Sequence, residues 1–120
     1  MSQDAHQTTM PPPTLSDLQE LVLRFQRARS WERFHLPKNI AMSVAIEAAE
    51  LMEHFQWSSP EESIAYVADD ANRREVADEM ADVLIYLLSL AHHCQIDLAE
   101  AVVIKMARNE TRFPVERYQS

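Results

Sequence analysis

The chain has 120 residues, a formal net charge of −8 and a pI near 5.0. This length predicts one domain with a hydrophobic core, and the acidic balance excludes nucleic-acid binding through a basic surface. No residue is glycine, which excludes the P-loop and the G-x-G-x-x-G turn, because both need glycine where the backbone approaches phosphate. An all-helical chain tolerates the absence of glycine best, since tight hairpin turns mostly use it.

The single cysteine, Cys94, excludes an intrachain disulfide and is typical of a reducing compartment. Because Cys94 lies beside an apolar run, we expect its side chain to be buried. The sequence has no run of 18 uninterrupted apolar residues, and its N-terminus lacks a signal-peptide pattern. We therefore expect a soluble, cytoplasmic protein with no membrane partner.

The N-terminal part of the chain predicts a tail followed by one helix. Residues 1–13 are polar and end in three prolines, so we expect them to be disordered. Thr14 is a predicted N-cap for a helix that runs from about Leu15 to Phe34, and Pro37 is predicted to stop it. Its buried stripe is predicted from apolar residues at helical spacing, namely Leu15, Leu18, Leu21, Val22, Phe25 and Ala28.

A second helix is predicted over residues 40–55, with Asn39 as its N-cap. At its end, His54 lies one turn beyond Glu50, where it could be a partner of the carboxylates, but a helix-end histidine that faces solvent is the favoured interpretation. Ser59 and Pro60 predict the start of a short helix over residues 60–68.

The remaining residues predict a connector and two long helices. The connector is polar and covers residues 69–74, and the helix after it covers about 72–93. Asp97 caps the last helix, which ends before Pro114. No strand is predicted, so the expected fold is all-α: a four-helix-bundle-like protomer with four main helices and one short helix. Its domain would span residues 14–114, followed by a short tail over 115–120.

Two of these helices share an unusual pattern of charge. Each contains a long apolar stretch with only two charged residues, Glu47 and Glu50 in the first and Glu79 and Asp82 in the second. The spacing i, i+3 places both carboxylates of a pair on one helix face. Because unpaired carboxylates are costly to remove from water and repel each other, a cation must meet them. Hard oxygen ligands in this number favour Mg²⁺, with Mn²⁺ as an alternative.

Two other interpretations of the carboxylates stay open at this point. In one, arginines such as Arg73, Arg74 or Arg108 neutralise them across the interface of a non-enzymatic helical dimerisation module. In the other, they hold two irons, but a di-iron carboxylate bundle uses Glu-x-x-His motifs, and neither pair is followed by histidine at that spacing.

Divalent ions among four carboxylates favour metal-assisted phosphoanhydride hydrolysis. Four carboxylates exceed the one or two that a single Mg²⁺ commonly takes, so two or three ions per site are compatible with the pattern. Such ions polarise phosphoryl oxygens and lower the pKa of water, and a carboxylate free of metal could accept the proton as general base. Trp31, Trp57 and Tyr86 could hold a flat base by stacking and edge contacts.

Several short segments occur in register along the chain. They are Trp31-Glu-x-Phe-His35, Glu47-Ala-Ala-Glu50-Leu, Phe55-Gln56-Trp57, Glu79-Met-Ala-Asp82-Val-Leu-Ile-Tyr86, Lys105-Met-Ala-Arg-Asn109 and Arg112-Phe-Pro. Together they resemble the MazG-like all-α nucleotide pyrophosphohydrolases, most closely the dCTP pyrophosphatase branch. The resemblance runs from Thr14 to Pro114.

This resemblance implies a helical homodimer or homotetramer that cleaves (deoxy)nucleoside triphosphates to the monophosphate and pyrophosphate with Mg²⁺, a nucleotide-pool house-cleaning activity. The expected substrates are dCTP or modified pyrimidine dNTPs. The resemblance assigns metal binding and catalysis to Glu47, Glu50, Glu79 and Asp82. It assigns substrate binding to Trp31, His35, Trp57 and Tyr86 on the base side and to Lys105, Asn109 and Arg112 on the phosphate side. One position departs from the dCTP enzymes: Val22 stands where they carry histidine, nine residues before Trp31, which leaves the preference for cytosine open.

Overall fold

The computed structural model of the chain describes residues 11–119, and these residues form helices without strands. The α-helices are α1 (Leu15–Ala28), α2 (Pro37–Glu53), α3 (Pro60–Ala68), α4 (Asp70–His93) and α5 (Leu98–Arg112). Single 3-10 turns, Glu32–Phe34 and Val115–Arg117, follow α1 and α5. The expected all-α class, with four main helices and one short helix, is confirmed. The expected disordered tail falls mostly on residues 1–10, which lie outside the described residues.

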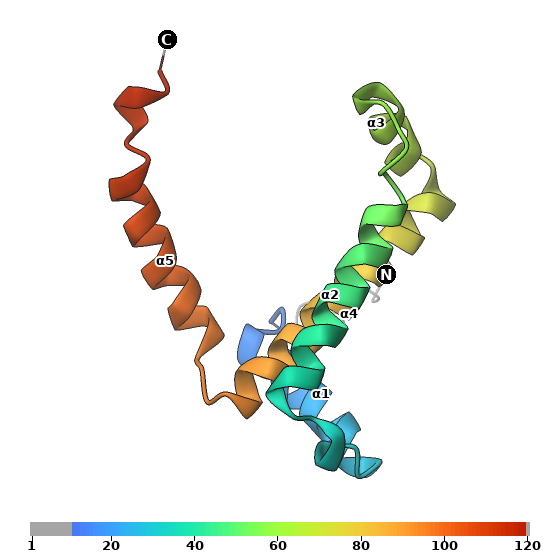
Figure 1. Cartoon of the computed structure of the whole chain (residues 1–120), viewed down its shortest axis with the longest axis vertical. Coiled ribbons are helices and arrows are strands. Elements are labelled where there is room, and N and C mark those ends of the chain that lie inside the picture. Colours follow the sequence, from blue (N-terminus) through green and yellow to red (C-terminus); the bar gives the residue numbers. More distant parts are fainter. Residues whose placement is uncertain (1–10, 120) are drawn as a thin grey trace, which may run out of the picture.

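The antiparallel pair of α2 and α4 is the centre of the fold (Figure 1). Helix α1 packs on α4, where the side chain of Gln19 donates a 3.0 Å hydrogen bond to the backbone carbonyl of Leu88. Helix α3 also packs on α4, near its start, because only Asp69 separates the two helices. These contacts build one arm of a V-shaped molecule, and they place α2 and α4 side by side over most of their length.

Helix α5 forms the other arm of the V and makes only marginal contact with the remaining helices (Figure 1). The described chain has a radius of gyration of 18.6 Å, whereas a compact domain of this length has about 14 Å. The expected bundle is therefore not closed within a single chain. No single described helix is long and apolar enough to cross a membrane; only α4 and α5 counted together, with a bend of 101° between them, reach that length and composition.

Helix α1 ends at Ala28, so the prediction that it continues to Phe34 was wrong. Ser30 takes the left-handed conformation with φ of 54°. The backbone N–H of Ser30 donates to the carbonyl of Arg27, and that of Trp31 donates to the carbonyl of Gln26, both at 3.0 Å. These are the two bonds of a Schellman motif, which usually has glycine at the left-handed position. In this chain, which has no glycine, serine occupies that position. The end of the helix therefore carries no glycine signal in the sequence.

Helix α2 begins at Pro37, so the predictions that Pro37 stops the preceding helix and that Asn39 is an N-cap were both wrong. Proline is favoured at the first helical position, where its missing N–H costs nothing. The connector predicted over 69–74 is likewise absent, because Asp69 caps α4 directly through the backbone N–H of Asn72. The caps predicted at other helix starts are confirmed: Thr14 and Ser59 form capping boxes, and Asp97 caps α5.

The buried apolar core of the described chain is small, and its members are Leu23, Ile40, Val76, Leu88 and Ala91. The stripe predicted for α1 was partly wrong, because Leu21 and Phe25 are exposed, and α1 instead buries Leu23 and Gln26. The hydroxyl of Ser89 on α4 donates a 3.3 Å hydrogen bond to the side-chain oxygen of Gln26. Cys94 is exposed, contrary to expectation.

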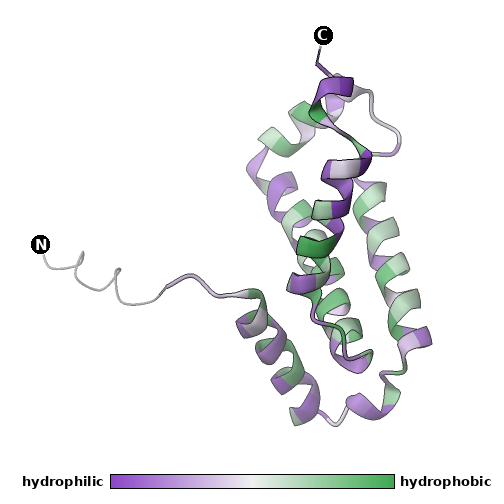
Figure 2. Cartoon of the chain, turned by 90° about the vertical axis from the view of Figure 1, so that its left-hand side faces the viewer, coloured by the Kyte–Doolittle hydropathy of each residue, from purple (hydrophilic) through white to green (hydrophobic). Residues whose placement is uncertain are grey.

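Large apolar side chains remain exposed along the long helices, and hydrophobic residues recur along these helices in the hydropathy colouring (Figure 2). On α2 and α4 they are Met42, Ile46, Met52, Met80, Leu84 and Ile85, and on α5 they are Val102, Val103, Ile104 and Met106. Exposed apolar surface of this extent marks an interaction surface.

Candidate metal centre

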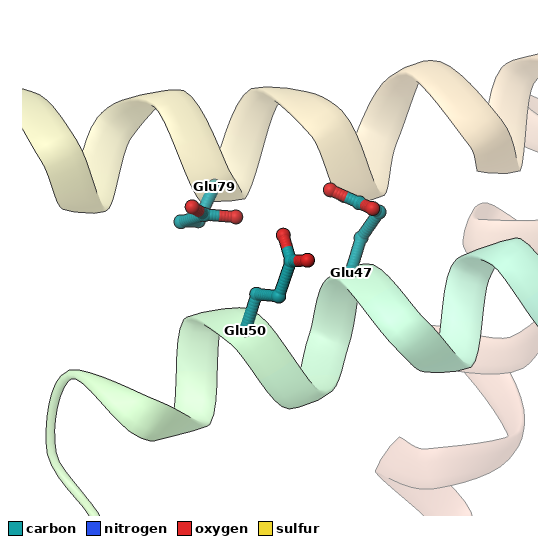
Figure 3. A group of neighbouring side chains, drawn as sticks. All are labelled: Glu47, Glu50 and Glu79. Carbon is teal, nitrogen blue, oxygen red and sulfur yellow. The ribbon is translucent and has the colours of Figure 1, made fainter.

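Three glutamates meet between α2 and α4. Glu47 and Glu50 lie one turn apart on α2 and point toward α4, and Glu79 reaches them from α4 (Figure 3). Each offers one carboxylate oxygen, and these oxygens all lie within 4.8 Å of one another. The expectation from spacing alone, that the carboxylates of two apolar helices converge, is confirmed for these three residues.

Asp82 lies beside Glu47 and belongs to the same cluster. The pKa of Glu47 is raised, first by burial, then by the negative charges of Glu50 and Asp82 and by hydrogen bonds between the carboxyl groups. The antiparallel register of α2 and α4 thus pairs Glu47 with Asp82 and Glu50 with Glu79. The four carboxylates thus form two pairs, which lie one helical turn apart along the contact between α2 and α4.

Glu79 is the most constrained member of the cluster. Its pKa is raised, first by burial, then by the charge of Glu50 and a hydrogen bond with it, then by the charge of Asp82; His54 acts in the opposite direction. Its Oε2 atom is shielded from solvent and has no hydrogen-bond partner among the described residues. A buried acceptor without a donor is costly, so this oxygen needs a partner that residues 11–119 do not provide.

The arginines of residues 11–119 leave the cluster unpaired. In that part of the chain the one ion pair joins Arg27 to Glu20 on the surface of α1, at 3.6 Å. Arg73, Arg74 and Arg108, proposed above as alternative partners, are exposed and form no ion pair there. A single copy does not test pairing with the arginines of a second copy, so the dimerisation module stays an alternative. The geometry gives no support to a di-iron site, because no histidine joins the group of three glutamates.

The residues fit a hard divalent cation. All the converging ligands are carboxylate oxygens, which suit Mg²⁺ or Mn²⁺. In an octahedral Mg²⁺ site with bonds of about 2.1 Å, adjacent ligands lie about 3.0 Å apart and opposite ligands about 4.2 Å, so the three oxygens, which lie within 4.8 Å of one another, would move closer together on binding. The orphaned Oε2 of Glu79 is the observation that most directly calls for a cation.

The residues predicted to bind the base do not all lie beside the carboxylate cluster. Tyr86 follows Asp82 by one turn on α4 and is half-buried. Trp57 lies just beyond α2 and is 88% exposed, while Trp31 lies beyond α1 and packs edge-on against Phe25, with ring centres 5.6 Å apart. His35 is half-buried between α1 and α2, and its ring centre is 5.7 Å from that of His93. Of these, Tyr86 alone continues the carboxylate stripe of α4.

The predicted phosphate-side residues are all on α5, which diverges from the α2–α4 pair (Figure 1). Asn109 contacts Met106 one turn earlier, with 3.7 Å between its amide nitrogen and the sulfur, and Arg112 lies over the ring of Phe113. Lys105 is exposed. A single chain does not bring these side chains to the carboxylates.

The favoured interpretation of His54, a side chain facing solvent, was wrong, because His54 is half-buried and its Nδ1 lies 2.8 Å from the hydroxyl of Tyr66 on α3. The spacing of Glu47, Glu50 and His54 places the histidine on the face of the cluster, whereas Tyr66 was missed. Nothing in the spacing indicates Tyr66, because the chain turns between the two residues.

The chain is similar to characterised proteins over most of its length. The model of the MazG-like family matches residues 42–120. dCTP pyrophosphatase 1 of Mus musculus is 42% identical over 105 residues, which cover 88% of this chain and 62% of that protein. The Homo sapiens protein of that name is 39% identical over 110 residues, covering 92% and 65%. This chain thus spans less than two thirds of the length of these relatives. The crystal structure of a pyrophosphatase from Archaeoglobus fulgidus superposes with a TM-score of 0.79 at 38% identity, covering 90% of this chain and 99% of that one.

Proposed function

Since the chain belongs to the MazG-like family, we propose that it hydrolyses (deoxy)nucleoside triphosphates to the monophosphate and pyrophosphate with Mg²⁺ as cofactor, Mn²⁺ being the alternative. The observation that carries this proposal is the cluster of Glu47, Glu50 and Glu79, whose oxygens converge within 4.8 Å without a basic partner in the described chain. Similarity to proteins named dCTP pyrophosphatase 1 and to a solved pyrophosphatase supports the reaction class.

In this proposal the four carboxylates bind the cation and also provide a general base. Glu47, Glu50, Glu79 and Asp82 hold the cation, and the raised pKa values of Glu47 and Glu79 reflect the burial and repulsion that a cation relieves. A bound Mg²⁺ would supply positive charge for phosphoryl oxygens and would lower the pKa of water. A carboxylate oxygen of the cluster that does not bind the cation would serve as the general base.

The substrate in this proposal is a pyrimidine deoxynucleotide. Relatives named for dCTP favour dCTP or a modified pyrimidine dNTP, and Tyr86, one turn from Asp82, offers a ring close to the cluster. Val22 offers no hydrogen bond to a base, so recognition of cytosine would depend on other residues. The base-pocket roles of Trp31, His35 and Trp57 stay predictions.

We further propose that the active form is a homodimer or homotetramer in which α5 of one copy covers the α2–α4 pair of another. Exposed apolar side chains lie on both surfaces, including Ile46 on α2 and Val103 on α5. Lys105, Asn109 and Arg112 would then approach the triphosphate from a second copy, since α5 of the same chain diverges from the carboxylates. We place the protein in the cytoplasm, where exposed Cys94 stays reduced.

The direct test is a panel of natural and modified dNTPs incubated with the protein and Mg²⁺, with pyrophosphate and orthophosphate measured separately. We expect pyrophosphate as the primary product and fastest turnover with a pyrimidine dNTP. Glu50→Ala should abolish turnover while the helical circular dichroism signal persists. Orthophosphate as the primary product would contradict the assignment.

A further inference from the structure

His54 continues the row of ligand positions on α2. Its backbone angles, φ of −66° and ψ of −22°, are still helical although it is the C-cap of α2. It therefore follows Glu47 and Glu50 at the spacing of three and four residues that keeps side chains on one helix face. Glu47 pairs with Asp82 and Glu50 pairs with Glu79 between the antiparallel helices. His54 therefore lies one helical turn beyond these pairs, toward the start of α4.

Tyr66 holds the His54 ring in place. The phenol oxygen of Tyr66 lies 2.8 Å from Nδ1 of His54, and the two ring centres are 5.8 Å apart. Phe55 packs edge-on against Tyr66 at 5.7 Å. The backbone of Tyr66 is fixed too, because its carbonyl accepts a 3.1 Å hydrogen bond from the side chain of Asn72 at the start of α4. The ring of His54 thus rests on a rigid support from α3 and α4.

The hydrogen bond decides which nitrogen of His54 is free to donate. The direction of the 2.8 Å bond between Nδ1 of His54 and the Tyr66 hydroxyl depends on the tautomer of the histidine; we assign the phenol as the donor. With Nδ1 as acceptor, the neutral imidazole carries its own proton on Nε2. No described residue accepts a hydrogen bond from that Nε2–H, so the donor remains available.

His54 also acts electrostatically on the cluster. In its protonated form, in which both ring nitrogens carry a proton, His54 lowers the pKa of Glu79, against burial and the two neighbouring carboxylates that raise it. No lysine or arginine of residues 11–119 forms an ion pair with the cluster. A triphosphate brought to this site by a cation would therefore meet His54 as the hydrogen-bond donor of the same chain.

We propose that Nε2–H of His54 donates a hydrogen bond to a phosphate oxygen of the metal-bound triphosphate, and that Tyr66 is the positioning residue that orients this donor. This inference rests on the proposed function and extends it to a residue outside the carboxylate set. It also explains what α3 contributes, because α3 supplies the hydroxyl that fixes the histidine.

The test compares His54→Leu, His54→Gln and Tyr66→Phe with the unchanged protein, with His92→Leu and Tyr118→Phe as matched controls at exposed positions. We expect His54→Leu to raise KM for the best dNTP about tenfold or more, as for loss of a hydrogen bond to a charged group. His54→Gln should recover most of this loss, since its amide can donate, and Tyr66→Phe should show a smaller rise. The apparent affinity for Mg²⁺ alone should stay unchanged.

A binding measurement separates this inference from the proposed function. Calorimetric titration of inorganic pyrophosphate in the presence of Mg²⁺ needs no turnover, and His54→Leu should weaken that binding by a factor similar to the KM change. If the unchanged protein releases pyrophosphate but His54→Leu and Tyr66→Phe keep its KM and its pyrophosphate affinity, the inference is overturned and the proposed function stands. A fall in melting temperature with KM unchanged would assign the pair a structural role and would also overturn it.

Discussion

Glu50 on α2 and Glu79 on α4 face each other across the contact between the two helices (Figure 3). After burial, the charge of Glu50 is the main influence that raises the pKa of Glu79. The repulsion between Glu50 and Glu79 therefore destabilises the metal-free fold. Apolar residues at these two positions would pack better. Such a compromise between stability and function is expected where a ligand resolves the repulsion.

Replacement of Glu50 by glutamine should separate stability from activity. Glu50→Gln keeps the side-chain shape but removes one negative charge from the cluster, so we expect a higher melting temperature in EDTA. Hydrolysis with Mg²⁺ should fall by at least about 100-fold, because even the outer partners of metal ligands contribute 10- to 100-fold. Glu53→Gln, at an exposed position one turn later on α2, is the matched control and should change neither property. A melting temperature lowered by Glu50→Gln would contradict the repulsion.

The contribution of Glu47 and Glu79 to the stability of the metal-free protein should rise as the pH falls toward 4.5. Glu47 and Glu79 have an ordinary pKa of 4.5, which is raised in the folded state by burial and then by neighbouring carboxylates. Between the two values the folded protein binds more protons than the unfolded chain, so acid favours the fold, and this contribution is lost as the pH rises through the folded pKa.

Thermal unfolding measured in EDTA over a pH series checks this expectation. Saturating Mg²⁺ should abolish the rise, because the cation takes the place of the protons and stabilises the fold by linkage. A metal-free protein whose stability does not change above pH 4.5, with or without Glu50→Gln, would contradict it.

His93 should produce a pH dependence of the opposite sign. Its pKa is lowered from 6.5, first by burial and then by the positive charges of His92 and His35, while Glu32 acts the other way. Its Nε2 is shielded from solvent without a partner among the described residues. The unfolded chain then binds more protons than the folded protein below pH 6.5, so stability is lost as the pH falls from there toward the folded pKa.

Measurement with Mg²⁺ present isolates His93 from the carboxylates. The melting temperature of the unchanged protein should fall between pH 7.5 and 5.5, and His93→Gln should flatten the curve. His92→Gln, at the exposed neighbouring position, should leave most of the dependence in place. An equal slope in the His93 variant would show that another group titrates.

Local spacing was enough to predict the convergence of Glu47, Glu50 and Glu79, but it was not enough to predict several helix ends or the contacts between helices. The pairs Glu47–Glu50 and Glu79–Asp82 each lie on one turn, so their faces follow from helix geometry alone. The end of α1 depends on left-handed Ser30, with φ of 54°, and serine does not signal that conformation, which glycine would normally mark. The end of α4 at His93 agrees with the predicted helix over 72–93, although Gln95 just beyond it is also left-handed, with φ of 58°.

Contacts made in three dimensions were also beyond the reach of sequence spacing. The bond between His54 and Tyr66 depends on the turn between α2 and α3, and the exposure of Phe25 depends on which side of α1 meets α4. The position of α5 cannot follow from its own amphipathic pattern, because that pattern does not distinguish packing within the chain from packing on another copy.

A charge placed on α5 should disrupt assembly. Val103 is 69% exposed in the single chain, and Val103→Asp should halve the molecular mass measured by light scattering, or reduce it further, since a buried unpaired carboxylate is strongly unfavourable. Hydrolysis should fall at least about tenfold with it, as for loss of a hydrogen-bonded contact to the charged triphosphate. Thr111→Asp adds the same charge at an exposed polar position of α5 and serves as the control. Unchanged mass and activity in Val103→Asp would remove α5 from the interface.

Mixing of two inactive variants should show whether one site draws residues from two copies. Glu50→Ala removes a carboxylate of α2, and Lys105→Ala removes a cation of α5, so each variant alone should be inactive. If Lys105 acts on the carboxylates of a partner copy, a mixed dimer contains one intact site, and random mixing restores about a quarter of full activity. Glu50→Ala mixed with Glu79→Ala lacks an intact carboxylate cluster in every pairing and should stay inactive. No recovery in the first mixture, with subunit exchange verified by mass, would place Lys105 and Glu50 in the site of the same chain.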